Sequence, residues 1–478
     1  MTSQTRSGIW RIFFFISVVC SFGWNTCAGA ITTTPLYIPE PRRALLGNED
    51  PPISLDATKG YMSNADLESK IKQFSSRCRD LSNIYSIGKS VNGANLWVIE
   101  ISKKLKMEES KPAFKYIGNV HGDEPLGREL LMRLANWICD NYNKEPLANL
   151  IVENMHLHIL PSMNPDGFSL RKRGNANNID LNRDFPDQFF PQNNDVNARQ
   201  PETLAVMKWI KKKRFVASAS LHGGALVANY PWDGSNDQKQ LYVKCPDDQS
   251  FQYLARVYST FHRNMSKSTE FYGGITNGAA WYPIYGGMQD WNYIHGQCFE
   301  LTLEVSDNKW PPADELPELW EYNKWSLLNL AASVLKSGVH GKVFSSTGKP
   351  LPGAVSVEGI NFTVEADDRF GDYYRILHPS GEYNVTVSMA SYKPKTTRIV
   401  LREEAPTSVD FILQPLIPPL RIMDGEDCKC DGVVSLRLFR NLNSQIYFLV
   451  FSVLVFLSFV LFSSRASRGR QSLRAPFV

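Results

Sequence analysis

Two histidines and one glutamate, carried on two segments of the sequence, have the residue types of a catalytic metal site. His121 and Glu124 follow an apolar segment that ends at Val120, and their spacing lets one loop present both side chains. His222 follows a second apolar segment and precedes two glycines, which allow backbone to approach a ligand closely. Zinc accepts imidazole nitrogen and carboxylate oxygen, and a catalytic zinc site combines three protein ligands with one open position. A His-x-x-Glu pair alone is common, so the prediction depends on the third ligand.

The other histidines are weaker candidates for ligands. His156 and His158 flank Leu157 in a strand-like segment, where a packed or a ligand-orienting role is expected. The remaining four lack a carboxylate or glycine context: His262, His295, His340 and His378.

The elements that must position these residues alternate between strands and helices. Strand-like segments cover residues 96–101, 114–120, 157–160, 216–221 and 299–305, and helix-like segments cover residues 127–142, 203–213 and 251–265. This alternation predicts an α/β domain over residues 58–337, with a mixed or largely parallel sheet. A long amphipathic helix over residues 319–336, stopped by Gly338, closes the domain.

Residues 338–414 have a different pattern. Short alternating segments are separated by Gly, Pro and Ser clusters at the spacing of an all-β sandwich, and no catalytic constellation lies among them. A Pro-rich stretch then opens a predicted stalk over residues 415–445.

Both ends of the chain carry membrane signals. Residues 1–30 have the basic, apolar and small-residue regions of a signal peptide, and residues 31–57 form an N-terminal segment. Residues 446–464 are apolar, uncharged and long enough for a short transmembrane helix. Four arginines in the tail, residues 465–478, predict a cytosolic C-terminus and a single-pass type I protein. We therefore expect a membrane of the secretory pathway, in the Golgi, endosomes or plasma membrane, with residues 58–414 on the lumenal or extracellular side.

Sequons and cysteines agree with that compartment. Asn264, Asn361 and Asn384 are candidate glycosylation sites. Six cysteines remain after the signal peptide, and they allow 15 pairings, so no pairing is assigned. The net charge is only +4, without a basic stripe, so the sequence gives no electrostatic indication of nucleic-acid binding. The longest basic run, residues 211–214, reads as a solvated helix end before a strand.

Six motifs occur in one order along the first domain. They are His121-Gly-Asp-Glu124, Asn164-Pro-Asp-Gly-Phe168, Ile179-Asp-Leu-Asn-Arg-Asp-Phe-Pro186, Leu221-His-Gly-Gly224, Gly286-Gly-Met-Gln-Asp290 and Leu303-Glu-Val-Ser306. Together they resemble the zinc carboxypeptidases, in particular the N/E-type (regulatory) branch that includes carboxypeptidases D, E, M and N. The resemblance covers roughly residues 60 to 415, and the β-sandwich is similar to the transthyretin-like domain of this branch. The whole layout is similar to a membrane-anchored, single-repeat relative of carboxypeptidase D.

The resemblance implies a role for each catalytic residue. His121, Glu124 and His222 would bind one Zn²⁺ ion in the catalytic domain. Glu304 would be the general base, since the metal lowers the pKa of water far enough for a carboxylate to suffice near neutral pH. Glu300, four residues earlier on the same face of the strand, is the rival for this role.

Further residues match the parts that orient ligand and substrate. Asp180 matches a carboxylate that orients the first histidine. Asn182 and Arg183 match the clamp for the C-terminal carboxylate, which a guanidinium can bind through both oxygens. Arg173 matches the arginine that stabilises the oxyanion, and Tyr282 matches the tyrosine that closes over the substrate. Two basic neighbours leave the register of Arg173 open: Arg171 and Lys172.

Specificity depends on fewer residues. Asp233, in Tyr230-Pro-Trp-Asp233, matches an aspartate that faces the side-chain pocket in this branch, and Gln289 matches a polar neighbour in the pocket. A buried carboxylate is costly without a partner, so a cationic side chain is its natural complement. Alternatively, Asp233 only initiates a turn at Asp233-Gly234. These assignments predict hydrolysis that releases C-terminal Lys or Arg from secreted peptides or protein precursors, peptide hormone precursors among them.

Three other functions stay open from the sequence. The same scaffold could serve as a catalytically inactive peptide-binding receptor, although the intact ligands and base argue against this. The β-sandwich and the tail could serve adhesion, and the pocket could accept apolar C-termini.

Overall fold

The computed structural model describes residues 60–103, 110–191, 194–403 and 406–417. The predicted signal peptide, N-terminal segment, transmembrane helix and tail, with nearly all of the stalk, lie outside these residues. Within the described ranges, no helix has the length and apolar character needed to cross a membrane.

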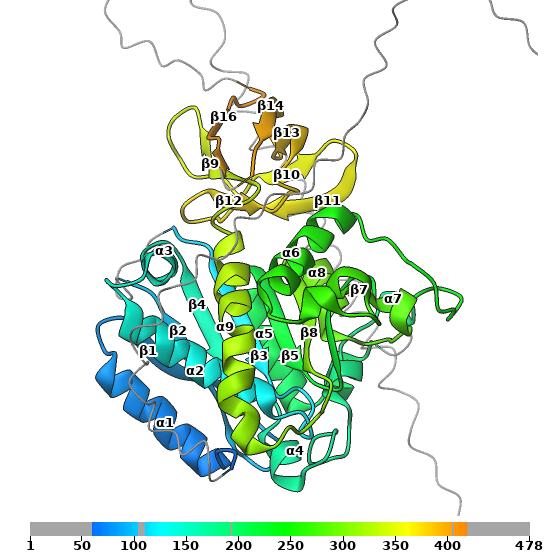
Figure 1. The fold of residues 1–478 in the computed structure, drawn as a ribbon. Coiled ribbons are helices and arrows are strands. Elements are labelled where there is room, and N and C mark those ends of the chain that lie inside the picture. Colours follow the sequence, from blue (N-terminus) through cyan, green and yellow to red (C-terminus); the bar gives the residue numbers. More distant parts are fainter. Residues whose placement is uncertain (1–59, 104–109, 192–193, 404–405, 418–478) are drawn as a thin grey trace, which may run out of the picture.

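The first domain is built on an eight-stranded sheet (Figure 1). Its strands are β1 (Ser82–Lys89), β2 (Asn95–Ile101), β3 (Ala113–Gly118), β4 (His156–Leu160), β5 (Phe215–His222), β6 (Ala225–Tyr230), β7 (Ile275–Asn277) and β8 (Phe299–Ser306). The strand order is β1-β2-β4-β3-β5-β8-β6-β7. Along this order, β4, β3, β5 and β8 pair in parallel, as do β6 and β7, whereas the pairs β1–β2, β2–β4 and β8–β6 are antiparallel. The predicted mixed α/β sheet is therefore confirmed.

Helices cover both faces of this sheet, as Figure 1 shows. They are α1 (Asn64–Arg77), α2 (Leu126–Asn141), α3 (Pro146–Asn154), α4 (Pro165–Leu170), α5 (Pro201–Lys213), α6 (Asp248–Phe261), α7 (Gly278–Trp281), α8 (Met288–Gly296) and α9 (Leu316–Ser333). Leu130 of α2, Leu254 of α6 and Leu327 of α9 belong to one buried cluster, and Ile210 of α5 and Trp291 of α8 belong to another. Because strand side chains alternate between faces, strands such as β2 and β3 contribute to both clusters.

Residues 339–413 form a β-sandwich, drawn in yellow and orange in Figure 1. Its strands are β9 (Val339–Ser345), β10 (Ala354–Val357), β11 (Ile360–Glu365), β12 (Asp372–Arg375), β13 (Gly381–Ser388), β14 (Lys395–Leu401), β15 (Thr407–Ser408) and β16 (Phe411–Leu413). One sheet has the order β11-β10-β13-β14, and the other joins β12, β9, β15 and β16. Alternate side chains such as Val343, Val355, Val385 and Phe411 fill the space between the sheets.

The two domains contact each other through buried and charged groups. Arg375 of β12 donates to Asp247 at 2.8 Å, and both side chains are fully buried. Phe362 stacks on Tyr293 of α8 with ring centroids 3.9 Å apart. Arg214, at the end of α5, donates to the carbonyl of Glu365 at 2.7 Å. The prediction of a solvated helix end at residues 211–214 is confirmed, since α5 ends at Lys213, β5 begins at Phe215, and Arg214 is exposed while it contacts the sandwich.

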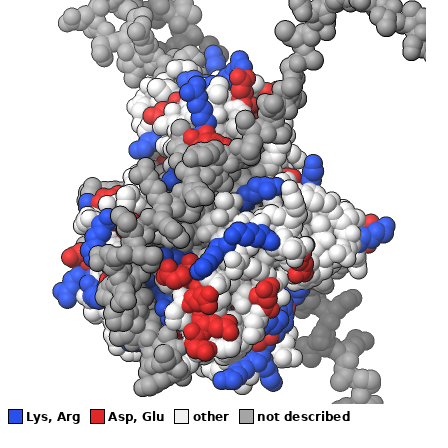
Figure 2. All heavy atoms as spheres, viewed as in Figure 1, with Lys and Arg blue, Asp and Glu red and all other residues white. Residues whose placement is uncertain are grey.

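Within the described residues, one disulfide links two helices, and the surface charge is mixed (Figure 2). Cys78 and Cys139 form the disulfide, which joins the end of α1 to α2 across 61 residues. Cys245 and Cys298 are buried and free. Figure 2 shows acidic and basic side chains interspersed over the face drawn there, with acidic ones gathered near its centre. The asparagines of the three sequons are exposed: Asn264, Asn361 and Asn384.

Candidate active site

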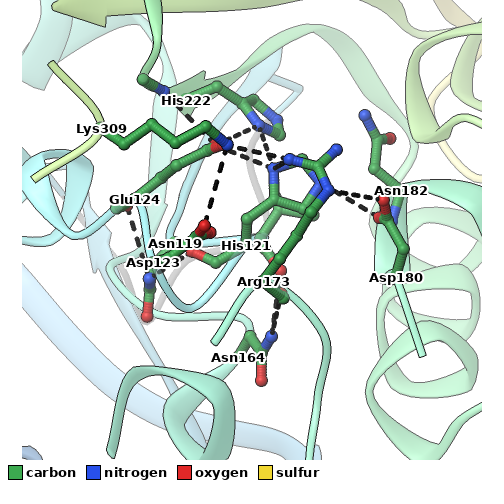
Figure 3. Close-up of polar contacts among 12 residues, drawn as sticks. Asn119, His121, Asp123, Glu124, Asn164, Arg173, Asp180, Asn182, His222 and Lys309 are labelled. Atoms are coloured by element: carbon green, nitrogen blue, oxygen red, sulfur yellow. Dashed lines mark hydrogen bonds and ion pairs between the residues drawn. The ribbon is translucent and has the colours of Figure 1, made fainter. Parts of the chain in front are cut away.

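Three buried side chains converge at the carboxyl ends of β3 and β5 (Figure 3). Nδ1 of His121 lies 2.8 Å from Oε2 of Glu124, and Nδ1 of His222 lies 3.1 Å from the same oxygen. Among the described residues, this is the group of His, Cys, Asp and Glu side chains whose ligand atoms are close enough to hold a metal ion. Two imidazole nitrogens and one carboxylate oxygen are a donor set that suits zinc.

Local backbone structure explains how the loop after β3 presents its ligands. Asn119 adopts a left-handed conformation with φ of 53°, and its side chain donates to the carbonyl of His121 at 2.7 Å. Gly122 packs directly on the backbone of α4, because a β-carbon there would lie 2.1 Å from the carbonyl carbon of Gly167. Asn164, which caps α4, reaches the carbonyl of Arg173 at 3.3 Å. The loop is thus held on one side by α4 and its cap.

Asp180 and Arg173 orient the ligands from the outside. Oδ1 of Asp180 lies 3.0 Å from Nε2 of His121, which directs Nδ1 of that ring towards Glu124. Oδ2 of Asp180 accepts from Nε of Arg173 at 2.9 Å. The hydrogen bond from His121 and the nearby positive charges outweigh burial and lower the pKa of Asp180, so it stays ionised. The same Arg173 reaches Oε1 of Glu124 at 3.2 Å.

Glu304 lies beside the ligand cluster at the end of β8, in register with His222 on β5. Its side chain is buried, and Oε2 has no hydrogen-bond partner among the residues that the structure describes. Burial and then the charge of Glu124 raise the pKa of Glu304. An unpartnered carboxylate oxygen next to a ligand cluster is free to accept a proton there.

Glu300 occupies a different environment on the same strand. Its Oε2 accepts from Nζ of Lys115 at 2.8 Å and from Oγ of Ser218 at 2.6 Å, and the ion pair with Lys115 is fully shielded from solvent. It does not line the cavity at the ligand cluster. The geometry therefore favours Glu304 over its rival as a base.

A cavity of about 110 Å³ joins the ligand cluster to the predicted specificity residues. Its walls include Arg173, Asn182, Arg183, Asp233 and Tyr282. Tyr282 is 45% exposed at the rim. A larger cavity of about 440 Å³ lies between the two domains, lined by other residues, and no group of metal-ligand spacing occurs there in the described ranges. We place the chemistry in the smaller cavity because the ligand cluster opens into it.

Asp233 lies at the bottom of this cavity. Its Oδ1 accepts from Nδ2 of Asn229 at 3.1 Å and from Nε2 of Gln289 at 2.9 Å, while Oδ2 is buried with no partner in the described part of the chain. A β-carbon at Gly287 would lie 3.2 Å from Oδ2, and one at Gly278 only 2.0 Å from Oδ1, so these glycines keep space around the carboxylate. Burial raises the pKa of Asp233 to about 7, with a further contribution from nearby carboxylates.

Some of the predicted pocket residues line the cavity, and one lies behind its lining. Gln289 lies behind Asp233 and does not line the cavity, since its Oε1 accepts from the backbone of Thr302 at 2.7 Å. It therefore positions Asp233 instead of forming a wall. Asn182 and Arg183 do line the cavity, and Oδ1 of Asn182 accepts from the backbone of Met288 at 2.9 Å.

Several site features were missed from the sequence. Lys309 lines the cavity and donates to Oε1 of Glu124 at 2.8 Å, although nothing in its local sequence marks it. Asn229 precedes the Tyr-Pro-Trp-Asp segment by one residue, and its position on β6 could have been found had that strand been recognised. His156 and His158 lie away from the cavity and contact Glu100 instead, so neither orients a ligand.

Comparison with known proteins agrees with this arrangement. The chain matches the family model for zinc carboxypeptidase over residues 67–326 and the model for the carboxypeptidase regulatory-like domain over residues 338–414. It is 60% identical to carboxypeptidase SOL1 of Arabidopsis thaliana over 425 residues, which are 88% of this chain and 86% of that protein. It is 41% identical to carboxypeptidase M of Mus musculus over 370 residues, covering 71% of this chain and 81% of that one.

Two further matches define the extent of the likeness. Carboxypeptidase D of Homo sapiens is 42% identical over 369 residues, which are 73% of this chain but only 26% of that longer protein. The crystal structure of thrombin activatable fibrinolysis inhibitor shares the fold, with a TM-score of 0.51 and 21% identity, over 58% of this chain and 75% of that one. The resemblance seen in the six motifs is thus confirmed, and the chain belongs to the zinc carboxypeptidase family.

Proposed function

We propose that this protein is a zinc-dependent carboxypeptidase that releases C-terminal Lys or Arg from peptides and protein precursors. The observation that carries the proposal is the pairing of two features in one cavity: the ligand cluster around Glu124, and the unpartnered Oδ2 of Asp233. A buried carboxylate oxygen without a partner favours a ligand that brings a positive charge and hydrogen-bond donors. Guanidinium and ammonium groups provide both.

Each residue around the cluster has a separate role in the reaction. His121, Glu124 and His222 would hold the metal, and a bound zinc ion supplies a Lewis acid and lowers the pKa of the attacking water. Glu304 accepts the proton from that water and returns it to the leaving amine. Arg173, held by Asp180, stabilises negative charge as it develops on the carbonyl oxygen.

The opposite wall selects a free C-terminus. Arg183 lines the cavity, and its guanidinium can bind both oxygens of a terminal carboxylate. Asn182, on the same wall, adds a polar neighbour. With the terminal carboxylate of the substrate at Arg183 and its last side chain at Asp233, the last peptide bond lies at the ligand cluster. One residue is therefore removed at a time.

We further propose that the enzyme is a glycosylated type I membrane protein of the secretory pathway. The disulfide between Cys78 and Cys139 supports an oxidising compartment. The apolar residues 446–464 and the basic tail support a membrane anchor, although both lie outside the described residues. In this setting, substrates are chains left with basic C-termini by an endoprotease.

A direct test compares peptides that differ only in the last residue. The zinc-loaded protein should release Arg and Lys with kcat/KM at least about tenfold above that for Phe, and Asp233→Ala should reduce this ratio. Stoichiometric zinc binding without release of any residue would favour the inactive-receptor alternative. Equal release of Phe would instead favour an apolar pocket.

A further inference from the structure

Lys309 lines this cavity and places its ammonium on the carboxylate of Glu124, one of the three candidate metal ligands. Its Nζ lies 2.8 Å from Oε1 of Glu124 and 3.8 Å from Oδ2 of Asp123. The aliphatic stem rests on Gly224, where a β-carbon would lie 3.3 Å from Cγ and from Cε of the lysine. Figure 3 shows the side chain extending over Glu124 towards His121.

The lysine belongs to a basic rim on one side of the cavity. Lys309 is 46% exposed, and the next residue, Trp310, stacks on Phe168 and lies under the guanidinium of the exposed Arg171 at 5.0 Å. Arg173 lies on the same side through its contact with Glu124. Asp233 is instead held by Asn229 of β6 and Gln289 of α8, which are not the elements that carry the basic rim.

This arrangement fixes which part of a substrate meets the lysine. If the last residue places its side chain at Asp233, the carbonyl to be cleaved lies at the ligand cluster, beside Glu124. That carbonyl belongs to the preceding residue, whose side chain is therefore held close to the cluster as well. A metal ion held at Oε2 of Glu124, the oxygen that faces both histidines, would weaken the attraction of Oε1 for the ammonium of Lys309, which can then pair with a substrate anion.

We propose that Lys309 is a specificity residue that favours Glu or Asp immediately before the C-terminal Lys or Arg. The inference rests on the proposed function, because it assumes that the terminal side chain binds at Asp233. The preferred substrate class is then a chain that ends in an acidic residue followed by a basic one. Attraction between half-exposed charges predicts a modest effect, about two- to fivefold in affinity.

The test measures peptide binding by calorimetry to the zinc-loaded Glu304→Gln protein, whose peptides stay uncut. Peptides ending in Glu-Arg and Gln-Arg differ by one charge at equal size. The Glu-Arg peptide should bind about threefold more tightly, Lys309→Met should abolish the difference, and Lys309→Glu should reverse it. After zinc is removed, the difference should shrink, because Glu124 then attracts the ammonium of Lys309 more strongly.

A matched control is Lys144→Glu, which makes the same charge change at an exposed site in the α2–α3 loop, outside the cavity lining. This variant should keep the full preference for Glu-Arg. Equal binding of both peptides to the protein with Lys309 intact, or a preference that survives Lys309→Met, would overturn the inference. Failure of the proposed function looks different, because the protein with Glu304 intact would then release no Arg from either peptide.

Discussion

Glu300 and Glu304 lie four residues apart on the same face of β8, yet only Glu304 opens into the cavity at the ligand cluster. Glu300 is neutralised by Lys115, whereas Oε2 of Glu304 has no partner within the described ranges. The strand thus carries one carboxylate that stabilises the sheet and one that is available for proton transfer. Their different surroundings predict different consequences for the same substitution.

Glu304→Gln should remove activity and leave the fold intact. We expect kcat to fall by a factor of about 10²–10⁴, because loss of a general base has effects of this size. Zinc content should not change, because the three candidate ligands remain.

Glu300→Gln should do the opposite: the ammonium of Lys115 loses its buried partner, which costs about 3–5 kcal/mol of stability. Folded Glu300→Gln protein should keep nearly all of its activity per molecule. Steady-state kinetics, metal analysis and thermal unfolding of both variants distinguish these outcomes, and the reverse pattern would assign the base to Glu300.

Recognition of a basic side chain should depend on pH through Asp233. The pKa of its carboxyl is raised to about 7 by burial, so the empty pocket is mostly protonated at pH 6 and ionised at pH 8. A cation binds the ionised form, and competitive inhibition by free arginine should therefore strengthen as pH rises from 6 to 8. Norleucine, which lacks the charge, serves as the reference, because metal and carboxylate contacts affect both amino acids alike. The arginine-to-norleucine ratio of inhibition constants should lose its pH dependence in Asp233→Asn.

The same buried carboxylate should cost stability at high pH. A carboxyl whose pKa is raised on folding, here from 3.8 to about 7, stabilises the fold fully below pH 3.8 and loses that contribution as pH rises through about 7. The free energy of unfolding of Asp233→Asn should therefore exceed that of the unmodified protein at pH 8, by roughly 1–3 kcal/mol, and its unfolding temperature should be higher. At pH 5 the difference should be smaller. Thermal unfolding at both pH values gives the comparison. A variant that is less stable at pH 8 would show that the carboxylate has an unrecognised cationic partner.

Strong periodic patterns made much of the fold predictable. The apolar segments of β3, β5 and β8 and the helix of α2 lie within a few residues of their expected bounds, because both faces of the central sheet are buried. β7, with three residues, is too short for a clear pattern, and β6 was also missed although it is as long as β3. The position of β6 between β8 and the edge strand β7 was also not evident from the chain order.

The candidate site was predictable only where a motif marks it. His121 and His222 lie about a hundred residues apart in sequence, and motifs identified both. The contact of Lys309 with Glu124 spans 185 residues and left no local signal. Likewise, Gln289 was predicted as a polar neighbour in the pocket, but its hydrogen bonds to Asp233 and to the Thr302 backbone place it behind the cavity lining. Residues that act through another side chain are fixed by packing in three dimensions, which spacing along the chain does not encode.

The buried ion pair between Asp247 and Arg375 should make the two domains unfold together. The guanidinium lies close to the rings of Phe299 and Phe362, at 5.6 and 5.7 Å from their centroids, and Tyr293 donates to the second oxygen of Asp247 at 2.6 Å. Arg375→Met leaves the carboxylate buried with one hydrogen bond, so we expect a loss of about 3–5 kcal/mol.

A double-mutant cycle isolates the contribution of the pair from that of the neighbouring rings. Asp247→Asn should also destabilise the protein, and the double variant should lose less than the sum of the single losses, by about 1–3 kcal/mol, because no charge is then left alone. Calorimetry should show one transition for the unmodified protein. Phe299 begins β8, the strand that carries Glu304, and the ring of Phe299 packs against Phe362 of the sandwich. Two separate transitions, with the first unaffected by Arg375→Met, would show that the catalytic domain folds without this contact.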